Sequence, residues 1–179
     1  MVSALSTLVS HASIMTKKRL IYSSYLVLLS LWWGWTVLTD FVIVPTVFRH
    51  IDIFFQAGEL GIAVFSRLNN LELIVSSALV ALLAYQTLKN KNALKFLAMG
   101  ILIWIISLVF FSYLTPKIIE LTALWKQADL MGLTSLKGIP DIQEEHHFFH
   151  NLYIGLDVVK LTIITVMISW GIYDEAKWS

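Results

Sequence analysis

Histidines and carboxylates gather in one stretch in the last third of the chain. Three of the five histidines lie there. Glu144 and His147 are three residues apart, as are His147 and His150, so each pair shares a helical face. Such spacing suits a zinc, copper or iron ion bound by imidazole and carboxylate groups. We therefore predict a divalent-metal site at these three residues, with His50 or Glu72 as fourth ligand. In the competing interpretation these side chains only face headgroups and water.

An acid and a base follow in the same apolar segment. Asp157 lies seven residues after His150, close to two helical turns, and Lys160 lies three residues further on. A charge at the centre of a membrane helix costs at least about 2.5–3.5 kcal/mol, so Asp157 and Lys160 are expected to pair. Two interpretations stay open. One is an internal ion pair that fixes packing, with Asp40 closing the network. The other is a role in binding or moving an ion or small solute.

The elements that position these residues must be membrane-spanning helices. Of the 179 residues, 58% are hydrophobic and 14% are charged, whereas soluble domains average about 45–50% and 25%. Residues 20–39, 73–88 and 96–116 carry no charged side chain. Runs of about 20 apolar residues match the thickness of the hydrocarbon core. The predicted fold class is therefore all-α, a polytopic transmembrane four-helix bundle.

The hydrophobic pattern also predicts the boundaries. One transmembrane domain covers residues 20–173, between cytoplasmic tails at 1–19 and 174–179. Its helices are expected at about 20–44, 71–88, 95–115 and 146–173. Pro45 is expected to kink or end the first helix. Residues 51–70 are interpreted either as an interfacial helix or as the entry to the second span. Helical periodicity after Pro116 leaves open a continuation of the third helix beyond the membrane.

Basic residues predict the orientation. Lysines and arginines cluster before the first helix and between the second and third helices, and Lys177 lies near the C-terminus. This end of the bundle is the expected cytoplasmic side, so the two longer connections lie outside. We predict a multi-pass protein of the cell (inner) membrane with both termini in the cytoplasm.

With that topology the unusual polar residues converge in the outer half of the bundle. The expected ion or solute pocket is outward-facing and is lined by Asp40, Arg49, Glu72, His150, Asp157 and Lys160. The expected partners are the lipid bilayer and a second copy or another membrane protein. The chain has no cysteine, which excludes disulfides and thiolate metal sites. It has no phosphate-binding glycine loop, no nucleophile motif and no basic-aromatic surface for nucleic acid. We assign no catalytic residue and do not favour an enzyme.

Several short motifs resemble a known family. The resemblance rests on Trp33-Gly34, Asp40-Phe41, Pro45, Phe48-Arg49, Leu114-Thr115-Pro116-Lys117, and Phe149-His150 followed by Asp157. These segments are similar to the first helix, the end of the third helix and the start of the last helix of the TMEM205-like (DUF4149) membrane proteins. Helix count, size and loop order agree over residues 20–173. The resemblance implies a four-helix fold and an association with transport and with drug or metal resistance.

Three functions stay open at this point. The first is the binding or transport of a cation or small solute, which predicts a cavity beside Asp157. The second is a structural or accessory subunit, which predicts a tight dry bundle with a large exposed apolar face. The third is a metal-dependent membrane enzyme, which predicts at least three protein ligands around one metal ion.

Overall fold

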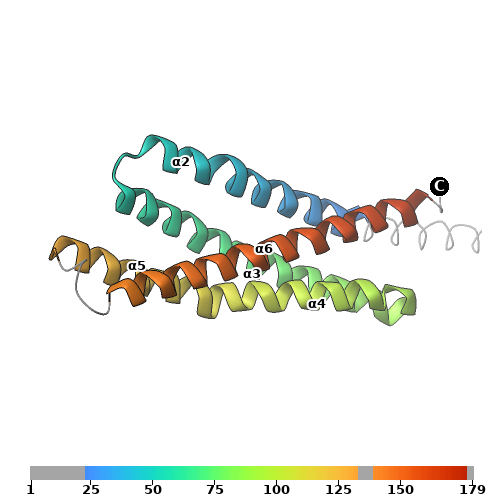
Figure 1. Cartoon of the computed structure of the whole chain (residues 1–179). Coiled ribbons are helices and arrows are strands. Elements are labelled where there is room, and N and C mark those ends of the chain that lie inside the picture. The colour runs from blue at the N-terminus through green and yellow to red at the C-terminus, as the bar shows by residue number, and fades with distance from the viewer. Residues whose placement is uncertain (1–22, 133–138, 177–179) are drawn as a thin grey trace, which may run out of the picture.

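The computed structural model describes residues 23–132 and 139–176, and these residues form long helices (Figure 1). Within these ranges, four helices are long and apolar enough to cross a membrane. They are Ser23–His50, Phe55–Lys89, Leu94–Leu130 and Asp141–Tyr173. The predicted fold class, a polytopic bundle of four transmembrane helices, is confirmed.

The first helix continues through its proline. Residues before Pro45 widen into a π-helical turn, η1 (Thr39–Ile43), and α2 (Val44–His50) carries the chain on with the proline in its first turn. Proline lacks a backbone N–H and crowds the preceding turn, and the wider turn accommodates this without ending the helix. The third span repeats the arrangement, because η3 (Phe110–Leu114) directly precedes Pro116 at the start of α5 (Thr115–Leu130).

The second span is longer than the sequence pattern predicted. Helix α3 (Phe54–Lys89) starts 17 residues before the expected boundary at residue 71, so no separate interfacial helix forms. Apolar residues at helical spacing drive this extension. Phe48 of α2 packs beside Gly61 of α3, where an added Cβ would make an ordinary van der Waals contact of 3.8 Å with the ring. Glu72 therefore lies in the middle of a helix, not at its entrance.

The third and fourth spans are also extended. The short 3₁₀ turn η2 (Lys91–Ala93) leads into α4 (Leu94–Val109), which runs through η3 into α5 and confirms that the third helix continues. Helix α6 (Ile139–Ala176) begins before His146, so the predicted start at residue 146 is wrong. Of the predicted tails, residues 1–19 and 177–179 lie outside the described residues, and 174–176 belong to α6.

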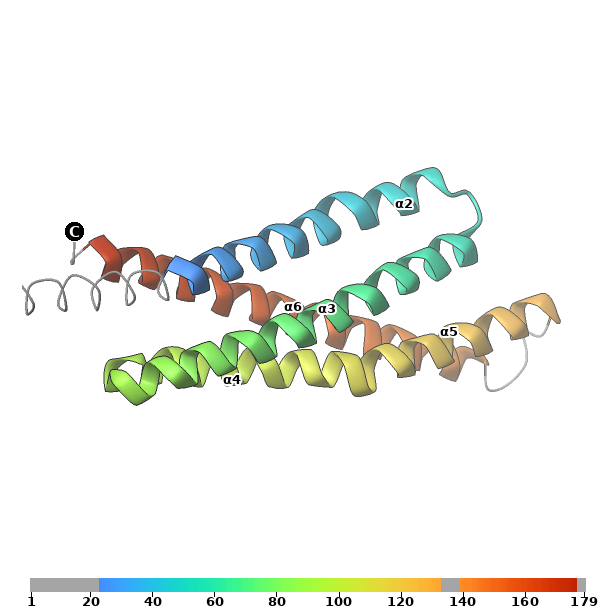
Figure 2. The same ribbon diagram turned by 180° about the vertical axis from the view of Figure 1, so that it is seen from behind.

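Two apolar clusters hold the bundle together. One joins all four spans toward the α3–α4 turn, with Tyr25, Leu83 and Met167 among its fully buried members. The other packs Phe110 and Leu114 against Tyr153 of α6. The views in Figure 1 and Figure 2 show α3 beside α4, and α5 beside α6.

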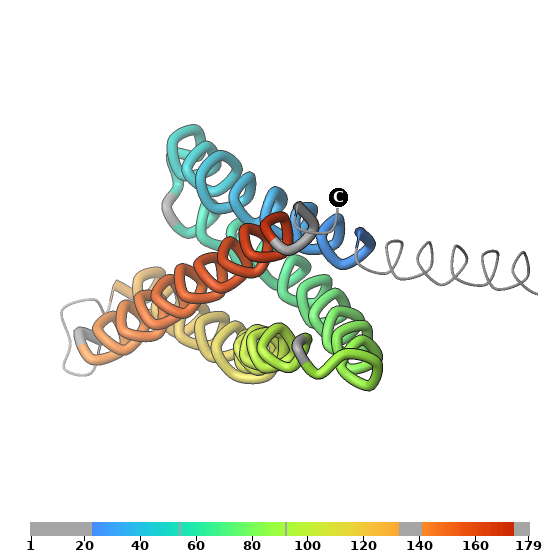
Figure 3. Tube along the Cα trace, turned by 90° about the vertical axis from the view of Figure 1, so that its right-hand side faces the viewer, coloured from blue at the N-terminus to red at the C-terminus, as the bar shows by residue number. Residues whose placement is uncertain are grey.

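The end of the first helix stands apart from this packed arrangement. Helix α2 lies against α3, whereas no Cα atom of η1 or α2 comes within 8 Å of a Cα atom in α5 or α6. Figure 3, turned by 90°, shows the same separation between α2 and the last helix. This separation shapes the candidate site.

Candidate functional site

The amino group of Lys160 lies at the centre of a buried ionic network. Its Nζ donates to both carboxylate oxygens of Glu72, at 2.7 and 2.8 Å, and contacts Oδ1 of Asp157 at 2.5 Å. An ammonium group has three donors, and here each has a carboxylate partner. Only 1% of Lys160 and none of Glu72 is exposed. The predicted Asp157–Lys160 pair is confirmed, and Glu72 joins it from a helix 88 residues away in the chain.

Glu72 is also held by the first helix. Trp32 donates its indole N–H to Oε1 of Glu72 at 3.0 Å, and the hydroxyl of Thr36 donates to the same oxygen at 3.3 Å. Both donors are fully buried. They lie one helical turn apart, so they face the same neighbour. The network therefore joins the first helix, α3 and α6, although no Cα atoms of α3 and α6 lie within 8 Å of each other.

This arrangement has a clear energetic reason. A buried charge is tolerated only when it is paired and when its remaining hydrogen-bonding capacity is satisfied. In lipid, water is not available to satisfy these groups. The Glu72 and Lys160 side chains connect α3 to α6, and Trp32 of the first helix donates to the same carboxylate. The pair thus links α3 to α6.

A second polar network lies next to the first. The hydroxyl of Tyr153 donates to Oδ1 of Asn69 at 2.9 Å, and the Asn69 amide donates to Thr115 at 2.6 Å. The Tyr153 ring stacks on Phe110 with centroids 4.2 Å apart, and the Phe110 centroid lies 5.1 Å from Nζ of Lys160. The π-helical turn η3 thus carries an aromatic ring against the ionic network.

Asp40 lies in the other π-helical turn, η1, next to the ionic network. Its carboxyl lies within hydrogen-bonding reach of Asp157 and within electrostatic range of Lys160 and Glu72. Closure of the network by Asp40 stays a prediction, which this position supports. The cluster contains three carboxyl groups and a single ammonium group. A hydrogen bond between Asp40 and Asp157 requires a proton on one of them, so two carboxylates face one ammonium group and the cluster keeps a net negative charge. Departures from α-helical geometry often occur at functional sites.

A cavity of about 600 Å³ adjoins this cluster. We call it the central cavity. Asp40 and Asp157 line it, whereas Glu72 and Lys160 lie behind its wall. Its remaining walls are mostly apolar, with aromatic side chains from α2, α3, α5 and α6: Phe48, Phe55, Phe65, Trp125 and Tyr153. Its size lies in the usual range for small-molecule pockets, about 300–1,000 Å³.

The histidine triad, His146, His147 and His150, lines the same cavity. The rings of His146 and His150 are parallel within 10°, with centroids 6.1 Å apart, and Trp125 packs on His146 at 5.6 Å. Nδ1 of His146 is enclosed and lacks a hydrogen-bond partner among the described residues. These imidazoles form an aromatic, polarisable end to the cavity.

In residues 23–132 and 139–176, no three or more His, Asp or Glu side chains are arranged to hold a metal ion. The predicted ligands Glu144, His147, His150 and His50 do not form such a group. His50 lies at the end of α2, where its ring contacts the carbonyl oxygen of Thr46 at 2.9 Å. The described residues therefore do not support a metal-dependent function.

The predicted pocket residues divide into three groups. Asp40, His150 and Asp157 line the central cavity. Glu72 and Lys160 form the ionic network behind it. Arg49 is exposed on α2 and joins neither group.

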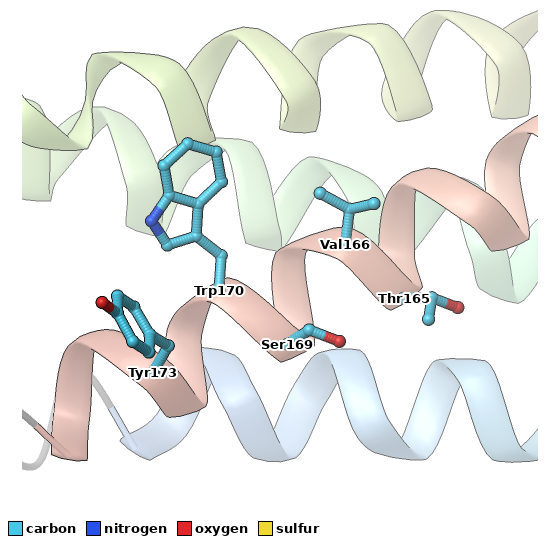
Figure 4. Close-up of a pocket in the computed structure, with 5 residues that line it drawn as sticks. All are labelled: Thr165, Val166, Ser169, Trp170 and Tyr173. Atoms are coloured by element: carbon cyan, nitrogen blue, oxygen red, sulfur yellow. The ribbon is translucent and has the colours of Figure 1, made fainter.

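A second hollow lies on α6 toward its C-terminal end. It is lined by Thr165, Val166, Ser169, Trp170 and Tyr173. Figure 4 shows Trp170 projecting toward α4, where Nζ of Lys95 lies 3.4 Å from its ring centroid. None of the predicted site residues lines this hollow.

Sequence reasoning missed several parts of the site. Trp32 and Thr36 were not predicted as site residues, because an apolar helix gives no indication of their partner. The aromatic walls were missed because α3 was expected to begin at residue 71, which left Phe55 and Phe65 outside a span. Pro45 and Pro116 gave the available signal, since each follows a π-helical turn beside the network.

Four apolar spans around a buried ionic network define a multi-pass integral membrane protein. The family model "Domain of unknown function (DUF4149)" matches residues 27–126, more than half of the chain. The chain therefore belongs to the DUF4149 family, which confirms the resemblance seen in the sequence. The matched range includes Asp40 and Glu72, whereas Asp157 and Lys160 lie beyond it. Searches of curated proteins and of solved structures each found no match.

Proposed function

We propose that the protein binds, or helps to transport, a small solute that carries a positive charge in the central cavity. The observation that carries this proposal is that Asp40 and Asp157, from the first and last spans, line one largely apolar cavity. Their counter-ion Lys160 lies behind the wall, only 1% exposed. The cluster holds more carboxylates than ammonium groups, so the electrostatic potential in the cavity favours a positively charged solute.

The aromatic side chains of the cavity walls also favour a positively charged solute. A cation over the face of an aromatic ring gains about 0.5–1 kcal/mol when exposed and about 2 kcal/mol when desolvated. Trp125, Tyr153 and three phenylalanines supply such faces. Carboxylates surrounded by aromatic rings suit an organic cation better than a small hydrated ion, which needs several oxygen ligands.

A pair of ions with the same shape and opposite charge tests the proposal. Tetraphenylphosphonium and tetraphenylborate both carry four phenyl rings, so a purely hydrophobic cavity binds them similarly. We expect the purified protein in nanodiscs to bind the cation and to discriminate against the anion. Equal affinity for the two ions, or no binding of the cation, would refute the proposal.

Substitution of Asp40 tests the cavity wall most directly. Asp40 lines the cavity, and Lys160 contacts Glu72 and Asp157 instead, so the substitution leaves those ion pairs in place. Asp40→Asn should weaken tetraphenylphosphonium binding at least about tenfold, equal to about 1.4 kcal/mol. Asp129→Asn, an exposed position on α5, is the matched control and should leave affinity unchanged.

The cavity favours this function over the accessory-subunit alternative, which predicts a tightly packed interior. A second copy or another membrane protein stays a predicted partner. Cross-linking of the protein in native membranes, followed by electrophoresis, tests that prediction.

We also propose that the protein lies in the cell (inner) membrane with both termini in the cytoplasm. Lys89, Lys91 and Lys95 cluster at the α3–α4 turn, and such clusters favour the cytoplasmic side. A reporter fused after Ser179 should be cytoplasmic, and one inserted near Gly132 should be external. A cytoplasmic signal at Gly132 would reverse the orientation of the cavity.

A further inference from the structure

The central cavity has an opening on the side of the bundle. Its walls come from η1 and α2 on one side and from α6 on the other. No Cα atoms of these two sides lie within 8 Å of each other. Of the described elements, α3 is the one that lies beside α2, apart from the adjoining η1 (Figure 1). The backbones of the first and last spans therefore lie apart beside the cavity, and the exposed side chains that line it mark where it opens.

The edges of this opening face outward from the bundle. Phe41 on η1 is 71% exposed, and Val158 on α6 is 57% exposed, yet both line the cavity. Ile154, one turn before Val158, shares both properties. Each of these residues lies next to an acid or on the same helix turn as one. The opening therefore presents apolar side chains to the surroundings and places carboxyl groups just behind them.

The surroundings of this opening are lipid. Val158 lies near the middle of the 33-residue span Asp141–Tyr173, where the hydrocarbon core is expected, since the core is about 30 Å thick. A hydrated cation in water has no direct route to this edge. A molecule that is already dissolved in the bilayer, with its charge near the interface and its apolar part among the acyl chains, meets the opening directly.

We infer that the cavity takes up an amphipathic organic cation laterally from the bilayer, between the η1–α2 segment and α6. The apolar body of the solute passes Phe41 and Val158, and its positive group meets Asp40 and Asp157. This inference rests on the proposed function and adds to it the class of solute and the route of entry.

The natural absence of cysteine makes a direct test available. In the Phe41→Cys/Val158→Cys double variant, the two thiols lie on opposite edges of the opening. The Cα atoms are too far apart for a disulfide, which needs about 7 Å or less. Bifunctional methanethiosulfonate reagents of increasing spacer length should bridge them, and a reductant should release the bridge.

The readout is the rate at which tritiated tetraphenylphosphonium occupies the protein in nanodiscs. Bridging should slow the uptake about tenfold or more, with the same final occupancy, and reduction should restore the original rate in the same sample. The two single-cysteine variants, treated with a monofunctional reagent of similar size, control for bulk at either edge and should keep near-normal rates.

The outcomes separate the inference from the function on which it rests. An unchanged uptake rate in the bridged protein would overturn lateral entry and would indicate access from the end of the bundle, past the histidine triad. Equal slowing by the monofunctional reagent would also overturn it, because the effect then reflects bulk in the wall. Failure of wild-type protein to bind tetraphenylphosphonium would instead overturn the proposed function.

Discussion

Removal of the Lys160 ammonium group should strongly destabilise the protein. In Lys160→Met the side chain keeps a similar length but loses its charge and its three donors. Glu72 then keeps Trp32 and Thr36 as donors, both of which contact Oε1, and its other oxygen loses the partner that lay at 2.8 Å. Asp157 loses the partner at 2.5 Å. Two buried carboxylates are left without a counter-ion.

The magnitude follows from this geometry. Loss of one member of a buried pair typically costs about 3–5 kcal/mol, because the remaining charge is uncompensated. That is a large part of the 5–15 kcal/mol by which proteins are usually stable. Glu72→Gln should cost less, about 1–3 kcal/mol, because Lys160 still contacts Asp157 and the amide oxygen can still accept from Trp32.

A double-mutant cycle isolates the interaction. The double variant Lys160→Met/Glu72→Gln removes both charges, so it should be more stable than the sum of the single losses predicts, by about 1–3 kcal/mol. Reversible unfolding in mixed micelles with increasing sodium dodecyl sulfate measures the free energy of unfolding for each variant. Lys126→Met, which removes an exposed ion pair with Glu59, is the matched control and should cost less than about 1 kcal/mol.

Two results would refute this reasoning. If Lys160→Met costs no more than Lys126→Met, Lys160 is not the counter-ion of a desolvated cluster. If the losses from Lys160→Met and Glu72→Gln simply add, the two side chains do not interact in the folded protein. Either result would also remove the structural basis for an acidic cavity wall.

Three further predictions concern packing, the second polar network and metal binding. Tyr153→Phe should lower stability by about 1–3 kcal/mol, since it leaves buried Asn69 without its donor, whereas Tyr113→Phe, at an exposed position, should be neutral. Gly171→Ala should destabilise by about 1–3 kcal/mol, because its Cβ would lie 2.5 Å from Tyr25 and Leu26. Gly155→Ala meets no atom within 4 Å and should be neutral or stabilising by up to about 1 kcal/mol. Zinc should not raise the melting temperature at neutral pH, because the histidine triad lacks the arrangement of a metal site.

Unfolding in mixed micelles measures the first two, and differential scanning fluorimetry measures the third. Equal effects of Tyr153→Phe and Tyr113→Phe would contradict the buried hydrogen bond. Equal stabilities of the two glycine variants would contradict the close contact between α6 and the first helix. A zinc-dependent rise that disappears when the histidines are replaced by alanine would restore the metal site as a function.

The amino-acid sequence by itself determined the class of the protein and one of its contacts. Long uncharged runs identify membrane spans, because lipid excludes charges and requires helices to satisfy their own backbone. The Asp157–Lys160 pair was also predictable, because residues three apart on one helix are neighbours wherever that helix lies. The uncharged runs and the spacing of Asp157 and Lys160 are both local properties, so they can be read directly from the order of residues.

The partner of Lys160 was decided by the tertiary structure. Glu72 is 88 residues away, and its apparent place at a helix entrance depended on a boundary that proved to lie at Phe54. The central cavity has the same origin. Its wall combines Asp40 of the first helix with Asp157 of α6, two spans whose backbones lie more than 8 Å apart beside the cavity. Helix crossing and separation depend on the packing of all four spans, and no single span carries that information.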